Sequence, residues 1–269
     1  MKKTLTLILC SPFFISCVSG TSNSDIIKKL EVDFDYDVIS ESEVAYTGYS
    51  IKNQKYLFDL QNAGGDTFKL DLNIPSEVII EGKNYSVTVI GGNEFTNVYV
   101  RSVVIPKSVT RIEERAFVRY TKLESVDIPN SVTRIGFKAF AGCAKLENIV
   151  IPNSVTHIGS KAFEGCVALR SLVIPASVTS IGAGVFSNCK YLETITFENP
   201  EPPYSCSQDA EDSSSDIPLP PPPINEPNLT HVFSGSNVKT VYVPAGAVDT
   251  YKEYFSLILG MEINVLPIK

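Results

Sequence analysis

Residues that could do chemistry are few in this chain, and their spacing opposes catalysis. Histidine occurs only at His157 and His231, and neither lies in a His-x-x-x-His pair or a nucleophile motif. Asp33, Asp35 and Asp37 alternate, but no glycine or distal glutamate completes a calcium loop around them. We interpret these aspartates as the solvated face of a strand. The sequence therefore predicts no enzymatic activity, no cofactor and no metal site.

Cysteines form the most regular chemical pattern. Cys143, Cys166 and Cys189 are spaced by 23 residues, and two of them follow Gly142 and Gly165 directly. Stacked coils lie about 4.8 Å apart, but equivalent Cβ atoms point in parallel, and three thiols cannot all pair. The alternative, a metal-binding trio, lacks a histidine or carboxylate to complete the ligand set. We predict three buried free thiols that fill the core.

The same spacing governs the elements that would position these residues. An Ile-Pro dipeptide recurs every 23 residues, and Val, Ile, Phe and Leu columns keep the same step, as at 105–106, 128–129, 151–152 and 174–175. A fixed period of this length indicates a solenoid, because one unit cannot cover its own apolar side and must stack on the next. Within one copy, the alternation over 146–151 predicts a short strand, and 162–166 predicts a turn that Gly165 ends.

The unit C-x-x-L-x-x-I-x-I-P-x-S-V-T-x-I-G-x-x-A-F-x-G at 143–165 resembles the BspA-like leucine-rich repeat of bacterial surface proteins. The resemblance covers roughly residues 30–269. It implies a right-handed, curved leucine-rich-repeat solenoid of 23-residue repeats, mostly short β-strands joined by turns. It also implies an exported or surface protein without enzymatic activity, of a kind often associated with adhesion. The resemblance names no ligand.

The chain before the repeats predicts export. Residues 1–17 begin with Lys2-Lys3 and continue through an apolar run that is too short to span a bilayer. Because Ser16 precedes Cys17 as in a bacterial lipobox, we predict lipid attachment at Cys17 and a location at the bacterial cell envelope or surface. Plain secretion after cleavage near Gly20 is the alternative. Residues 18–30, small and polar, would form a tether.

The remaining boundaries follow from changes in the pattern. We predict a β-rich N-terminal cap at 31–73, a solenoid at 74–244 and a C-terminal cap with a short helix at 245–269. A hairpin with its tip at 81–84 interrupts the first repeat. Residues 204–228 are rich in proline, serine and acidic residues, and predict a disordered insertion.

A net charge of −7 argues against nucleic acid or an anionic membrane surface as the main partner. We expect the protein to contact the membrane only through the lipid anchor. Two functions stay open. One is a surface-displayed protein that binds a protein or glycan partner of unknown identity. The other is a structural envelope or spacer protein without a dedicated ligand.

The candidate partner-binding surface, here called the strand face, consists of the outward residues of the ladder strands. Since side chains alternate along a strand, the residues beside each inward pair must face out. They are nearly uncharged, and small polar groups alternate with apolar ones, as suits a partner surface, although β-propensity alone would select similar residues. The strand face comprises Ser102, Val104, Ser125, Asp127, Asn148, Val150, Ser171, Val173, Thr194, Thr196, Thr240 and Tyr242. A competing site for an acidic glycan is the basic stripe of Arg111, Arg134, His157, Arg115, Lys138 and Lys161.

Overall fold

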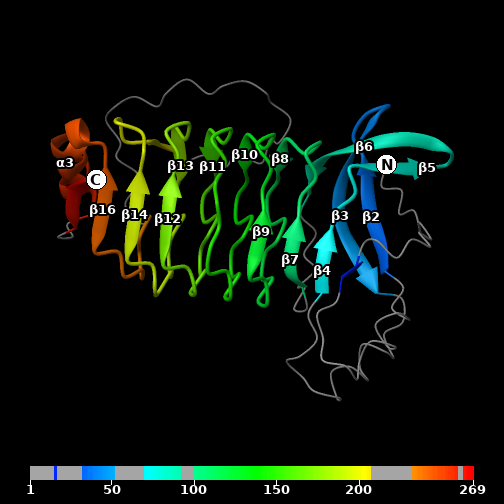
Figure 1. Ribbon diagram of the computed structural model, residues 1–269, viewed down its shortest axis with the longest axis horizontal. Helices are drawn as coiled ribbons and strands as arrows, with labels where there is room; N and C mark the ends of the chain where they lie inside the picture. The colour runs from blue at the N-terminus through cyan, green and yellow to red at the C-terminus, as the bar shows by residue number, and fades with distance from the viewer. Residues whose placement is uncertain (1–14, 17–31, 52–69, 92–99, 207–231, 260–262) are drawn as a thin grey trace, which may run out of the picture.

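The computed structural model describes residues 15–16, 32–51, 70–91, 100–206, 232–259 and 263–269. The repeats wind into a solenoid whose coils stack along the long axis of the molecule (Figure 1). The predicted lipidation site at Cys17, the tether, nearly all of the export segment and residues 207–228 of the predicted insertion lie outside the described residues. In the described part of the chain, no helix has the length and apolar character of a membrane span.

A column of phenylalanine rings runs through the core. Neighbouring rings stack with their centroids 5.2 to 6.0 Å apart, and each ring is at most 1% exposed. Burying each ring contributes roughly 1.5–3 kcal/mol. The prediction of a phenylalanine core column is confirmed for Phe117, Phe140, Phe163, Phe186 and Phe233.

The three predicted thiols lie beside this column. Cys143, Cys166 and Cys189 are free and fully buried. Each Sγ donates to the carbonyl oxygen of a phenylalanine in the preceding coil at 3.1 to 3.2 Å. Burial raises the pKa of the Cys189 thiol to about 12, and it raises the pKa of Cys166 well above the ordinary value. The structure therefore confirms buried free thiols, and they stay protonated at neutral pH.

The ladder strands form two separate parallel sheets (Figure 1). The first contains β4 (Leu70–Asn73), β7 (Val100–Val104) and β9 (Ser125–Asp127), with β1 (Ile15–Ser16) antiparallel at its edge. The second contains β12 (Ser171–Ile174), β14 (Thr194–Phe197), β16 (Thr240–Val243) and β17 (Asn264–Pro267). The parallel ladder thus begins before the predicted solenoid boundary at 74 and continues past 244.

Residues 147–151 lie between these two sheets and form no strand, so the prediction of a strand over 146–151 is wrong. Ile149 and Ile151 do point inward, as the alternation requires. Alternation predicts which side chains are buried, but it does not fix the distance between neighbouring backbones. The segment keeps its inward side chains without pairing to either flanking coil.

The other side of the solenoid is one continuous sheet. Its short parallel strands are β8 (Arg111–Ile112), β10 (Arg134–Ile135), β11 (His157–Ile158), β13 (Ser180–Gly182) and β15 (Tyr204–Cys206). The predicted disordered insertion is therefore wrong for 204–206, because these residues pair with β13 and the Tyr204 N–H donates to the Thr179 carbonyl at 2.8 Å. The sheet continues at the N-terminal end through β6 (Lys83–Ile90), β3 (Glu43–Ile51) and β2 (Val32–Val38).

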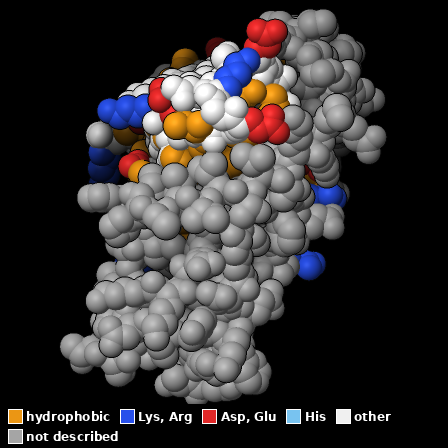
Figure 2. All heavy atoms as spheres, turned by 90° about the vertical axis from the view of Figure 1, so that its right-hand side faces the viewer, with side chains coloured by type: hydrophobic (Ala, Val, Ile, Leu, Met, Phe, Trp, Pro, Cys, Tyr) orange, Lys and Arg blue, Asp and Glu red, His pale blue; other side chains and the backbone are white. Residues whose placement is uncertain are grey.

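Each end of the ladder is covered by different structure. At the N-terminal end, β2 and β3 are antiparallel, and β5 (Glu77–Ile80) forms the predicted hairpin with β6. Its turn residues Glu81 and Gly82 both have positive φ, as a tight hairpin turn needs. Viewed from this end, apolar side chains lie among charged ones of both signs (Figure 2).

At the C-terminal end, the 3₁₀ turn η1 (Ala245–Ala247) and helix α3 (Val248–Leu259) follow β16. Phe255 packs against Phe197 and Phe233, with centroids 6.3 and 6.1 Å apart. The buried Tyr251 donates its hydroxyl to the Asn199 carbonyl at 2.9 Å. The helix therefore closes the end of the phenylalanine column, and the predicted closing helix is present.

Candidate functional site

The register of the ladder aligns the strand face into two columns. Asp71, Ser102 and Ser125 are paired in one column of the first sheet, and Asn73, Val104 and Asp127 in the other. In the second sheet the same columns continue with Ser171, Thr194, Thr240 and Asn264, and with Val173, Thr196, Tyr242 and Leu266. The columns follow directly from the repeat, because equivalent residues of successive coils pair in parallel register.

Exposure varies along the strand face. Ser125, Asp127, Asn148 and Ser171 are exposed, and so are the three valines. The remaining predicted members, Ser102, Thr194, Thr196, Thr240 and Tyr242, are half-buried. All twelve residues thus keep some solvent contact, and the most accessible ones lie in the middle of the solenoid.

The gap between the two sheets is the most open part of the strand face. Val150 is 78% exposed, against 43% for Val104 and 48% for Val173. In other coils, backbone hydrogen bonds join the strand face to the neighbouring coil. The Glu124 N–H, for example, donates to the Arg101 carbonyl at 2.7 Å. Among the hydrogen bonds of the described residues, none joins the backbone of 147–151 to a neighbouring coil. The face therefore opens at this coil.

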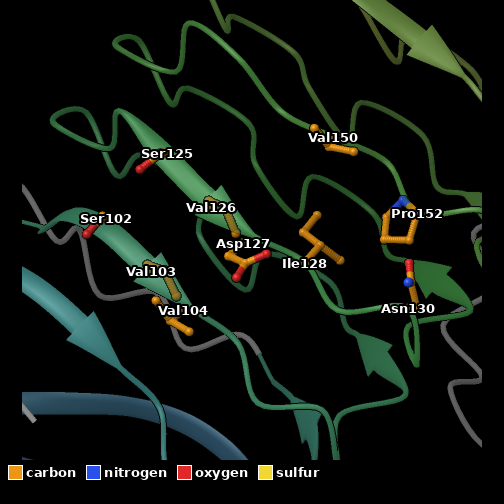
Figure 3. Close-up of a pocket in the computed structure, with 10 residues that line it drawn as sticks. All are labelled: Ser102, Val103, Val104, Ser125, Val126, Asp127, Ile128, Asn130, Val150 and Pro152. Atoms are coloured by element: carbon orange, nitrogen blue, oxygen red, sulfur yellow. The ribbon is translucent and has the colours of Figure 1, made fainter.

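A groove of about 490 Å³ lies beside this opening (Figure 3). It runs across β7, β9 and the end of the unpaired segment 147–151, where Val150 and Pro152 lie beside the two strands. Its lining comprises Ser102, Val103, Val104, Ser125, Val126, Asp127, Ile128, Asn130, Val150 and Pro152. The mixture of hydroxyl, amide and carboxylate groups with aliphatic ones suits a ligand that is partly polar and partly apolar.

The groove brings together only part of the predicted face. Five predicted residues line it, whereas Asn148 and all the predicted residues from Ser171 onward lie outside it. Alternation missed the other five lining residues, because it assigns inward and turn residues to the core or the loops; they are Val103, Val126, Ile128, Asn130 and Pro152. The asparagine directly after Ile128-Pro129 was the available sequence signal.

A partly buried ion pair between Asp71 and Arg101 lies in the first coil of the strand face. Asp71 is 7% exposed and accepts from the Arg101 guanidinium through both carboxylate oxygens, with Nε to Oδ1 at 2.9 Å. The Ser102 hydroxyl also donates to this carboxylate, at 2.6 Å. Such a bidentate pair is geometrically specific. Sequence reasoning missed it, because Asp71 and Arg101 lie 30 residues apart across the interrupted repeat.

The described residues offer little for catalysis. They contain no group of three His, Cys, Asp or Glu side chains that could hold a metal ion. The three stacked cysteines are buried and protonated, so they are poor nucleophiles.

Comparisons with known proteins agree with this architecture. Residues 88–202 match the family described as BspA type leucine rich repeat region, in 6 copies. No curated protein matches the chain. The match is to a repeat family and not to an enzyme family.

Two solved structures show the same fold. A leucine-rich repeat protein from Bacteroides ovatus ATCC 8483 is 24% identical with a TM-score of 0.54, over 87% of this chain and 51% of that one. A leucine rich cell surface protein from Faecalibacterium prausnitzii A2-165 is 23% identical with a TM-score of 0.54, over 96% of this chain and 51% of that one. The predicted leucine-rich-repeat solenoid is confirmed, and the chain spans about half the length of these two proteins.

Proposed function

We propose that this chain, whose residues 88–202 form a BspA-type leucine-rich repeat region, is an exported surface protein that binds a protein or glycan partner through its strand face. The family match and the likeness to a cell surface protein support the location. A scaffold built of stacked repeats offers an extended surface on which many side chains can contact one partner.

The observation that carries this proposal is the opening around Val150. The Val150 side chain is 78% exposed and lines a groove that combines aliphatic residues with the polar residues Ser102, Ser125, Asp127 and Asn130. Protein interfaces likewise combine apolar side chains with polar ones. Burying Val150 against a partner would remove apolar surface from water, which favours association.

The test uses the purified exported chain and an immobilised extracellular-matrix protein extract. The double substitution Val150→Glu and Val173→Glu places two negative charges on the strand face. We expect it to weaken binding to the extract at least tenfold. The comparison variant, the double substitution Arg134→Glu and Lys138→Glu, changes the opposite sheet and should retain binding to this extract after its acidic polysaccharides have been removed enzymatically. If the valine pair binds like the parent, the strand face is not the site. If the parent does not bind, the spacer function replaces this proposal.

We also propose that Cys17 carries the lipid, since Ser16 precedes it as in a lipobox. Metabolic labelling with a radioactive fatty acid should mark the parent and not Cys17→Ser. Equal labelling of the two chains would exclude Cys17 as the attachment point.

A further inference from the structure

The basic stripe lies on the continuous sheet and takes no part in the strand face. In three consecutive coils a cation or histidine is followed four positions later by another cation, at 111–115, 134–138 and 157–161. The structure places these residues in two neighbouring columns. Both columns are half-buried, so their charged ends reach solvent while their stems pack on the solenoid.

The first column is fixed by strand pairing. Arg134 is in parallel register with Arg111 on one side and with His157 on the other. Neighbouring strands lie about 4.8 Å apart, so these side chains leave the sheet at that interval. A ligand with regularly spaced anionic groups would match a column of this kind.

The second column is fixed by an unusual backbone conformation. Arg115, Lys138 and Lys161 all have positive φ, at 55°, 52° and 58°. The Lys138 N–H donates to the Ser160 carbonyl at 3.0 Å, and the Lys161 N–H donates to the Ala183 carbonyl at 2.9 Å. Since these bonds join successive coils, the second column repeats with the same geometry as the first.

Glycines between the two columns let neighbouring coils approach closely. A Cβ added at Gly136 would lie 2.6 Å from the Glu113 carbonyl carbon, and one at Gly159 would lie 2.6 Å from the Phe137 nitrogen. The coils are therefore as close as they can be at this point. A backbone packed in this way has little conformational freedom to lose when a ligand binds, which favours affinity.

Positive charge is in excess on the middle coil. Arg111 pairs with Glu113 at 3.1 Å, Arg115 with Glu114 at 3.7 Å, and Lys161 with Glu164 at 4.0 Å. Within the described residues, Arg134 and Lys138 form no ion pair. The Lys138 ammonium instead lies 5.1 Å from the centre of the Phe137 ring. The neutralised cations thus flank two that remain available to an anion.

We propose that the basic stripe binds an acidic polysaccharide, whose carboxylate or sulfate groups contact Arg134 and Lys138 and continue along the two columns. The net charge of −7 repels a polyanion from the rest of the molecule, so such a chain would be directed to this stripe. This site is independent of the strand face, and either could exist without the other.

The experiment measures binding of the exported chain to immobilised heparin, which is sulfated, and to polygalacturonate, which is carboxylated, with dextran as the uncharged control. We expect binding to at least one polyanion, little binding to dextran, and weaker binding as salt screens the charges. The double substitution Arg134→Glu and Lys138→Glu should reduce binding to the polyanion at least tenfold. Binding to heparin alone assigns sulfate as the recognised group, and binding to polygalacturonate alone assigns carboxylate.

A matched variant carries the same change in charge elsewhere. Lys145→Glu with Lys190→Glu replaces two exposed lysines outside the stripe and should leave polyanion binding within about twofold, an expectation based on screening of distant charges. Val150→Glu with Val173→Glu should also bind both polyanions like the parent. Equal losses in the Lys145 and stripe variants, or no binding to either polyanion, would overturn the proposal. Tighter binding of double-stranded RNA through the same two residues would replace the polysaccharide with a nucleic acid.

Discussion

The strand face and the β8–β15 side are built from the same repeat, yet only the second is continuous. On the β8–β15 side, each strand pairs with its neighbours through every coil from β8 to β15. On the strand face, the ladder stops at β9 and resumes at β12. A repeat therefore sets the order of the coils without making every side equally tight.

Side-chain contacts explain the difference. On the continuous side, the Ser154 and Ser177 hydroxyls donate to carbonyls of the preceding coil at 2.6 and 2.7 Å, and glycines allow direct backbone contact. On the strand face, residues 147–151 make neither such a side-chain bond nor a backbone hydrogen bond to a neighbouring coil, among the bonds of the described residues. The opening beside residues 147–151 exposes the core only slightly. Val126 and Ile128 next to it are 8% and 7% exposed, whereas Ile195 and Val241 in the second sheet are fully buried.

The largest expected effect comes from the core, which both sides share. Phe163→Ala should lower the free energy of unfolding by about 3–5 kcal/mol, because it leaves a cavity between two stacked rings. Val150→Ala, on the open face, should change it by less than about 0.5 kcal/mol. Urea unfolding monitored by circular dichroism gives both values. A nearly neutral Phe163→Ala would mean that the column does not hold the coils together.

A smaller effect should come from the tight side. Gly159→Ala puts a methyl group 2.6 Å from the Phe137 backbone nitrogen, so the coils must move apart. We expect a loss of about 1–3 kcal/mol in unfolding free energy, as for other overpacked sites. Gly246→Ala is the matched control, because a Cβ there meets nothing within 4 Å. If the two substitutions cost the same, close packing of the glycines does not explain the continuous sheet.

The smallest effect per residue concerns the buried thiols beside the phenylalanine column. Burial raises the pKa of Cys189 from 9.0 to about 12, so the folded state holds a proton that the unfolded thiol loses above pH 9. Stability from this thiol is complete below pH 9 and is lost between pH 9 and 12, by roughly 1 kcal/mol at pH 10.

The free energy of unfolding should therefore be lower at pH 10 than at pH 7. This difference should shrink when the three buried cysteines are replaced by alanine. Tyr251 and Tyr254 add a similar dependence at higher pH, since burial raises the pKa of both hydroxyls. An unchanged difference between the two pH values in the alanine variant would show that the thiols titrate alike in both states.

The sequence by itself determined the repeat and what it buries. Period and alternation identified the phenylalanine column, the cysteine column and the inward Ile residues, because a residue that recurs in every coil has the same neighbours in every coil. The hairpin was also predicted, with its tip at 81–84, whereas the structure confines the turn to Glu81 and Gly82. Positive φ is ordinary for glycine but not for glutamate, so the sequence did not show the exact turn. The closing helix followed from its apolar spacing.

Only the tertiary structure decided where the coils separate and which charges meet. The sequence at 146–151 alternates like its neighbours, so nothing local shows that Val150 lies beside a gap. Arg101 reaches Asp71 across an insertion, and Tyr204 pairs with β13 although proline surrounds it. These outcomes depend on distances between coils, which arise from the twist and packing of the whole stack and not from any one repeat.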